Sequence, residues 1–165
     1  IIEAASILKN EESIEFIFAG GGSERVNLEK KVYDLNLPNI TLIPRQPKKK
    51  MQQLWSLCDI SLVHLRNNSI YKSVIPSKIF ESMAMGLPIL ICVPDGEATN
   101  LVEYYGAGIF IKPENPSELA KKILDISKDK QQLDLLSRNG KKAAINFNRA
   151  NLAEDMLNHI KKLLT

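Results

Sequence analysis

Five short apolar runs, each followed by a segment with helical spacing, constrain the fold of this chain more than any other feature. The predicted strands cover residues 15–20, 40–43, 59–63, 89–93 and 107–111. The helical patterns cover residues 1–9, 28–35, 51–58, 76–85, 97–104, 116–127, 130–146 and 149–164. Strands that alternate with helices predict an α/β fold with a Rossmann-like parallel sheet, and such sheets bind ligands at the carboxyl ends of their strands.

The central helix is delimited by residues with strong positional preferences. Pro76 suits a first helical position, because its missing N–H would have no partner there, and Gly86 suits the left-handed end of a helix. Pro88 then prevents continuation. The predicted buried face consists of Ile79, Phe80, Met83 and Ala84.

The first turn of this helix is a candidate phosphate site. Unpaired amides and the positive end of the helix dipole favour an anion, and Ser77 and Lys78 add a hydroxyl and a cation. Glu81 lies four residues after Ser77, so its carboxylate could accept hydrogen bonds from two ribose hydroxyls of a nucleotide. The alternative is a solvated helix glutamate that pairs with Lys78 at i,i+3.

A second candidate is the turn Gly20, Gly21 and Gly22, which follows the first predicted strand. Backbone amides at such a turn can approach a phosphate or a sugar. The turn matches neither G-x-G-x-x-G nor the Walker loop. Tight strand-to-helix turns also need glycine for conformational reasons alone, so this alternative stays open.

The composition excludes several functional classes. With 165 residues, 44% of them hydrophobic and 25% charged, the chain fits one globular domain, and a net charge of +3 indicates no nucleic-acid surface. The basic run 48–50 is expected to be a solvated helix start. Cys58 and Cys92 are expected to be reduced thiols, which indicates a cytoplasmic protein. No apolar run approaches the ~20 residues that span a bilayer.

Metal and nucleophile signatures are missing from the sequence. His64 and His159 are the only histidines, and neither they nor the cysteines have the spacing of a metal site. His159 is expected at the surface, whereas His64 could contact a ligand or serve as a loop or capping residue. No Gly-x-Ser-x-Gly or Cys–His arrangement is present. We therefore expect no metal and no cofactor.

The order of the landmarks is similar to that of a known family. The central helix with Glu81, the segment Met-Ala-Met-Gly-Leu-Pro-Ile-Leu at 83–90, the turn at Gly96 and Leu-Val-Glu at 101–103 resemble the donor-binding half of retaining glycosyltransferases of family 4. The resemblance covers nearly the whole chain. It implies one half of a two-domain GT-B type enzyme that transfers sugar from a nucleotide diphosphate sugar, with UDP favoured, to a glycan or lipid-linked acceptor.

The resemblance also implies roles for individual residues. Ser77 and Lys78 would bind the diphosphate and Glu81 the ribose, Gly20 to Gly22 would line the donor cleft, and Arg45 and Gln46 would border the base, largely through backbone atoms. Such an enzyme works chiefly by positioning the donor and stabilising the departing diphosphate.

The chain also departs from the family pattern. Many members carry a second glutamate before the one matched by Glu81, with seven residues between the two, but Ser73 stands at that position here, and Ile-Pro-Ser-Lys at 75–78 replaces a Gly-Phe-Gly turn. This suggests a branch in bacterial capsule or lipopolysaccharide synthesis. The family's first strand, the basic pair after it and the acceptor domain would all precede Ile1. We therefore expect a fragment that binds nucleotide weakly and does not transfer sugar alone; any membrane contact would belong to the full-length protein.

Two other functions remain open at this point. A nucleotide-sugar epimerase shares the two-domain architecture, but it would place more titratable residues in the cleft. A noncatalytic nucleotide-binding or interaction module would lack a second Rossmann-like domain upstream in the parent protein.

Overall fold

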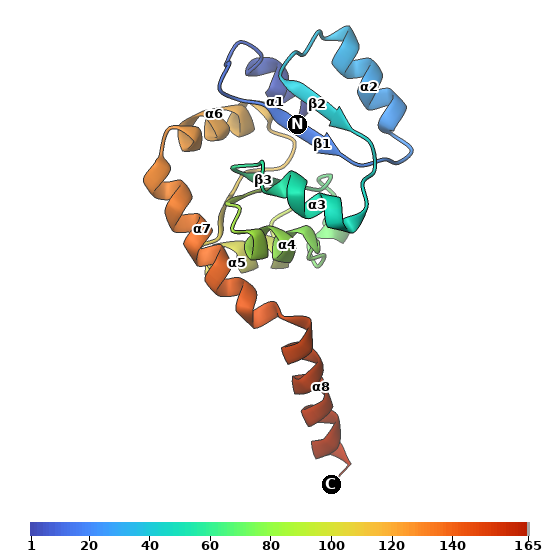
Figure 1. The fold of residues 1–165 in the computed structure, drawn as a ribbon, viewed down its shortest axis with the longest axis vertical. Coiled ribbons are helices and arrows are strands. Elements are labelled where there is room, and N and C mark those ends of the chain that lie inside the picture. The colour runs from blue at the N-terminus through green and yellow to red at the C-terminus, as the bar shows by residue number, and fades with distance from the viewer. Residues whose placement is uncertain (165) are drawn as a thin grey trace. The chain divides into compact units, whose positions relative to one another are not determined.

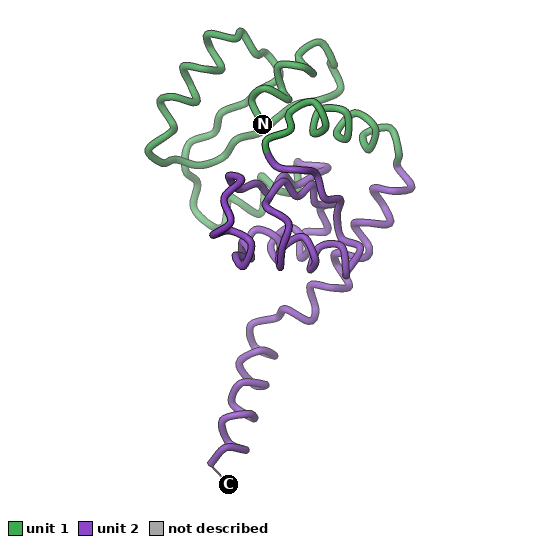
Figure 2. The backbone as a smooth tube through the Cα atoms, turned by 180° about the vertical axis from the view of Figure 1, so that it is seen from behind, with its two compact units in different colours: residues 1–57, 114–129 green, residues 58–113, 130–165 purple. Residues whose placement is uncertain are grey.

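The computed structural model describes residues 1–164, which form two compact units (Figure 2). The first unit contains residues 1–57 and 114–129. The second contains residues 58–113 and the chain from residue 130 onward. The chain therefore passes from the first unit to the second at residue 58, returns to the first unit for residues 114–129, and ends in the second.

The first unit is built on a two-stranded parallel sheet (Figure 1). Strands β1 (Phe16–Ala19) and β2 (Ile40–Ile43) pair in register from Phe16 opposite Ile40 to Ala19 opposite Ile43. The helices are α1 (Ile2–Ile7), α2 (Arg25–Asp34), α3 (Lys48–Trp55) and α6 (Pro116–Ser127). Helix α1 packs against α6, where Ala4, Ala5, Leu119, Ala120 and Ile123 are buried.

The second unit is built on a three-stranded parallel sheet in the order β3-β4-β5. These strands are β3 (Ser61–His64), β4 (Ile89–Cys92) and β5 (Gly108–Phe110). The helices are α4 (Lys78–Met85), α5 (Glu97–Tyr104), α7 (Lys130–Ala144) and α8 (Arg149–Leu163), with short 3-10 turns at Ser69–Tyr71 and Ile145–Phe147. All of β4 is buried, as expected for a central parallel strand.

The core of the second unit lies between its sheet and helices α4, α5 and α7. Ile79 and Met83 of α4 pack there with Ile89 and Ile91 of β4 and with Val102 of α5. Helix α7 packs against α4 at Gly140, where a Cβ would make an ordinary contact, 3.5 Å from the Cα of Met83. The core therefore fixes the position of α4 from both the strand side and the α7 side.

The predicted α/β fold is confirmed, and most predicted elements lie within two residues of the observed ones. The strands, however, form two sheets where one was expected. Apolar runs predict strands, but they carry little information about which strands pair, because pairing depends on contacts distant in sequence.

The prediction for α4 was wrong in two details. The helix begins at Lys78 with Ser77 as its N-cap, two residues after Pro76. Ala84 is exposed, and Ser82 is buried in its place on the face that contains Ile79 and Met83. Burial of Ser82 is tolerated because its hydroxyl forms 2.7 Å hydrogen bonds with the hydroxyl of Ser61 and the carbonyl of Lys78. The predicted end is confirmed, since Gly86 caps α4 with a φ of +70°.

Helix α8 extends away from the sheet of the second unit in both views (Figures 1 and 2). All of its side chains are exposed, including Leu152, Met156, Leu157, Ile160 and Leu163. His159 is exposed on it, as predicted. Within residues 1–164, no helix combines the length and the apolar character that a membrane crossing requires.

Candidate functional site

The carboxyl ends of the strands in the second unit lead directly to the first candidate residues. Strand β3 ends at His64, and the following segment reaches the first turn of α4. Helix α4 ends at Met85 with Gly86 as its C-cap, and β4 begins three residues after this cap, at Ile89. Since this connection is so short, the beginning of α4 lies at the carboxyl edge of the sheet, where parallel α/β sheets bind ligands.

The first turn of α4 offers polar groups that the protein does not use itself. Ser77, Lys78 and Glu81 are exposed, and the Ser77 hydroxyl makes no capping hydrogen bond. The Ile79 amide is already bonded to the Pro76 carbonyl at 3.0 Å, contrary to the expectation that every amide of this turn is unpaired. This hydrogen bond spans three residues rather than four, so the backbone at the start of α4 forms a tight 3-10 type turn. The amides of Ser77 and Lys78 have no hydrogen-bond acceptor in the described residues.

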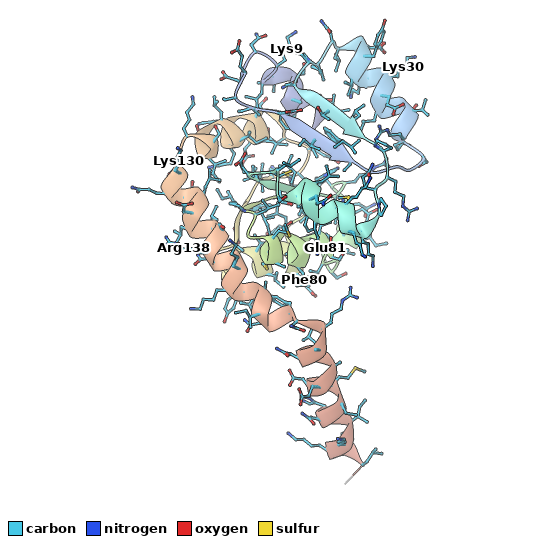
Figure 3. The ribbon with its side chains drawn as sticks, viewed as in Figure 1. Lys9, Lys30, Phe80, Glu81, Lys130 and Arg138 are labelled. Carbon is cyan, nitrogen blue, oxygen red and sulfur yellow. The ribbon has the colours of Figure 1, made fainter. Side chains whose placement is uncertain are left out.

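Glu81 is the acidic residue of this turn (Figure 3). It lies one turn after Ser77, and its carboxylate forms no hydrogen bond or ion pair with any residue in 1–164. The i,i+3 ion pair with Lys78, which was the alternative interpretation, is therefore not formed. Both carboxylate oxygens are available to accept hydrogen bonds from a ligand.

Helix α5 provides a contrast, because the protein itself occupies its first turn. The Glu97 amide donates to the Lys72 carbonyl at 2.9 Å, and the Gly96 amide donates to the Thr99 hydroxyl at 3.0 Å. The Thr99 hydroxyl in turn donates to the Asp95 carboxylate at 2.9 Å. The turn at 95–97 therefore serves to start α5 and to hold the segment before α4, in agreement with a capping role.

His64 is exposed at the end of β3, on the same edge of the sheet as the first turn of α4. Its pKa is lowered from the ordinary value, mainly because surrounding protein atoms partly desolvate the ring, and the positive charge of Lys78 contributes. A lowered pKa favours the neutral imidazole, which can donate and accept a hydrogen bond at the same time.

In the first unit, the glycine turn lies at the carboxyl end of β1. Gly20 and Gly22 have φ angles of +150° and +143°, which L-residues rarely adopt, whereas Gly21 has no such restriction. A Cβ at any of the three would meet no atom within 4 Å. Backbone conformation rather than crowding therefore requires glycine at two positions, and the space beside the turn is open.

Arg25, which sequence reasoning missed, holds this turn in place. Its guanidinium donates to the carbonyls of Gly20 at 3.1 Å and Ile43 at 2.9 Å, and it also pairs with Glu29. One side chain thus ties together the ends of β1 and β2. The sequence signal for this role is an arginine in the first turn of the helix that follows a glycine-rich turn. This signal does not reveal the contact with the Ile43 carbonyl, because Ile43 is 18 residues away.

Arg45 and Gln46 follow β2 directly, at the same edge of this sheet as the glycine turn. Arg45 is exposed. The Gln46 amide folds back to the Pro44 carbonyl at 3.0 Å. The structure thus groups Gly20, Gly21, Gly22, Arg45 and Gln46 at one sheet edge of the first unit, and Ser77, Lys78 and Glu81 in one turn of the second.

Solved structures with the same fold include three proteins of bacterial origin. HepE of Anabaena, in complex with UDP-glucose, is 21% identical with a TM-score of 0.78, and the match covers 98% of this chain and 44% of that one. A glycosyltransferase from Rickettsia africae is 18% identical, with a TM-score of 0.78 and coverages of 99% and 43%. Sucrose-phosphate synthase from Thermosynechococcus elongatus is 20% identical, with a TM-score of 0.76 and coverages of 99% and 42%.

These matches establish the GT-B glycosyltransferase fold, and the chain spans less than half the length of each of these structures. Comparison with curated proteins found no match. The model of the family "Glycosyl transferases group 1" matches residues 1–143, and the chain belongs to this family.

Proposed function

We propose that this chain is the donor-binding domain of a glycosyltransferase that uses a nucleotide diphosphate sugar, with UDP as the favoured nucleotide. The observation that carries the proposal is the first turn of α4, where a hydroxyl, an ammonium group and a carboxylate are exposed without protein partners at the carboxyl edge of a parallel sheet. Membership of the glycosyl transferases group 1 family supports it. HepE, which shares the fold, was solved with UDP-glucose.

In this proposal, the diphosphate binds at the start of α4. The Ser77 hydroxyl and the amides of Ser77 and Lys78 would donate hydrogen bonds to phosphate oxygens, and the Lys78 ammonium group would balance their charge. The two oxygens of Glu81 would accept hydrogen bonds from the two ribose hydroxyls. Donors and a positive charge at Ser77 and Lys78 thus face the diphosphate, and an acceptor at Glu81, one turn later, faces the ribose.

For the first unit, we propose donor contacts by the residues at its own sheet edge. The open turn at Gly20 to Gly22 would let the backbone approach the donor closely, and Arg45 would border the base. Because the Gln46 side chain is bonded to the Pro44 carbonyl, Gln46 would contribute its backbone rather than its side chain.

The chemical contribution of these residues is positioning and electrostatic stabilisation. A leaving nucleotide diphosphate gains negative charge as the bond to the sugar breaks, and Lys78 with the helix amides would stabilise that charge. We propose further that transfer occurs with retention, as in family 4, and moves a hexose-type unit onto a glycan or lipid-linked acceptor of bacterial capsule or lipopolysaccharide synthesis at the cytoplasmic face of the membrane. The acceptor domain would lie elsewhere in the parent protein.

Glu81→Gln tests the proposal, because it keeps the size of the side chain and removes its charge. Loss of charge-assisted hydrogen bonds worth about 1.5–3 kcal/mol should weaken UDP binding about 10- to 100-fold in calorimetric titration. Glu154→Gln, at an exposed glutamate of α8, is the matched control and should bind UDP like the wild type. Equal affinities of the two variants would exclude Glu81 from the site.

A further inference from the structure

The second unit contains a hollow of about 400 Å³ between the end of α5 and helix α7. This volume is in the range of small-molecule sites, which is about 300–1,000 Å³. Its lining includes Glu103, Tyr104, Tyr105, Asn139, Lys142 and Asn146. None of these residues belongs to the candidate donor site.

An exposed aromatic ring forms one wall of the hollow. Tyr104 is 83% exposed, yet its ring contacts Tyr105 edge-to-face, with centroids 5.0 Å apart and an interplanar angle of 86°. Tyr105 in turn packs against Phe147 with centroids 5.4 Å apart. The Tyr104 ring is thus supported by an aromatic cluster while most of its surface faces solvent, so little conformational entropy would be lost when a ligand stacks on it.

The remaining lining is polar and electrically balanced. Glu103 and Lys142 contribute opposite charges, and Asn146 adds an amide; within the described chain these three side chains have no hydrogen-bond or ion-pair partner. The Asn139 amide donates to the Gly106 carbonyl at 3.1 Å, which orients it and leaves its oxygen available. Donors and acceptors are therefore both present around one aromatic face.

We propose that this hollow is a carbohydrate-binding site. A pyranose presents an apolar face of C–H groups, which stacks on an aromatic ring, and a rim of hydroxyls, which need both donors and acceptors. A phosphate or a polyanion would need a surplus of positive charge, and the lining has none, because it contains one acidic residue, Glu103, and one basic residue, Lys142. The ligand class that matches the lining is a neutral saccharide.

The topology places this hollow away from the first turn of α4. Helix α5 starts after the carboxyl end of β4 and ends at Tyr104, four residues before the amino end of β5. The hollow therefore lies toward the amino edge of the sheet, whereas Ser77 and Lys78 lie at the carboxyl edge. A saccharide bound here is not the transferred donor sugar, so the inference goes beyond the proposed function and does not depend on it.

Amide NMR titration of the ¹⁵N-labelled full chain tests this site with two neutral disaccharides, maltose and N,N′-diacetylchitobiose. We expect saturable shifts for at least one of them in residues 103–106 and 139–146. Tyr104→Ala should weaken this binding about tenfold or more, which corresponds to about 1.4 kcal/mol, because the stacking face is lost. Tyr104→Trp, which keeps an aromatic face, should retain it.

Tyr33→Ala is the matched control, since Tyr33 is 85% exposed on α2 in the first unit. It should bind the disaccharides like the wild type. A separate UDP titration, read at residues 77–81 and in Glu81→Gln, reports on the proposed function independently. The inference is overturned if neither disaccharide causes saturable shifts at the hollow up to its solubility, if Tyr104→Ala binds like Tyr33→Ala, or if inorganic phosphate produces the same shifts.

Discussion

Gly96→Ala tests how the segment that leads into α4 is held. A Cβ on Gly96 would lie 2.2 Å from the carbonyl oxygen of Lys72 and 2.9 Å from its carbonyl carbon and Cα. All three are backbone atoms, so no side-chain rotation can relieve the clash. The φ of Gly96 is 170°, which is extended backbone open to any residue, so the effect is steric rather than conformational.

The magnitude follows from the two interactions that must change. Overpacking against backbone costs about 1–3 kcal/mol, and moving Lys72 away breaks its 2.9 Å hydrogen bond from the Glu97 amide, which adds about 0.5–1.5 kcal/mol. We therefore expect Gly96→Ala to lower the free energy of unfolding by about 2–4 kcal/mol. Displacement of the segment should also speed hydrogen exchange at the Glu97 amide and weaken UDP binding at Ser77 and Lys78.

Gly140→Ala is the control for this experiment. A Cβ there meets its nearest atom at 3.5 Å, an ordinary contact, and alanine is favoured over glycine in a helix by about 1 kcal/mol. Urea unfolding and amide exchange should therefore show a destabilised Gly96→Ala and a Gly140→Ala at least as stable as the wild type. A Gly96→Ala variant with wild-type unfolding free energy and unchanged exchange at Glu97 would refute the steric reasoning.

Two further substitutions test the two sheet edges. Lys78→Met should weaken UDP binding and reduce its dependence on salt concentration, because one charge contact to the diphosphate is lost. Lys130→Met, at an exposed lysine of α7, should change neither the affinity nor its salt dependence. Calorimetry at two ionic strengths would measure both variants, and an unchanged salt dependence for Lys78→Met would remove Lys78 from the phosphate site. Gly22→Ala should lower the free energy of unfolding by about 1–3 kcal/mol through strain at a φ of +143°. Gly21→Ala, where φ imposes no such strain, should leave it nearly unchanged in urea unfolding. Equal effects of the two substitutions would show that φ is not the cause.

Local signals predicted most of the secondary structure. Helices α5 and α6 have the predicted bounds, 97–104 and 116–127, because their boundaries are marked by residues with strong positional preferences. Asn115, for example, caps α6 by accepting a hydrogen bond from the Glu118 amide at 3.1 Å, and Pro116 follows at a position where proline is favoured. Such signals act within a few residues of each other, so the sequence contains them in full.

The face of α4 shows where local pattern fails. Hydrophobic spacing predicted Ala84 as buried and ignored Ser82, but Ser82 is buried because the Ser61 hydroxyl of β3 lies within hydrogen-bond distance of its own. A serine becomes a core residue only when a partner supplies its hydrogen bond, and that partner is 21 residues away. Periodicity alone cannot register such a partner.

The sequence by itself determined the order of strands and helices, the left-handed end of α4 at Gly86, and the placement of Gly20, Ser77 and Glu81 after strands, because each depends on neighbours along the chain. Only the tertiary structure decided that the strands form two sheets, that Arg25 joins the ends of β1 and β2, and that the protein occupies the first turn of α5 but leaves Ser77, Lys78 and Glu81 of α4 exposed. These features depend on contacts between residues far apart in the chain, whose geometry is set when the core packs.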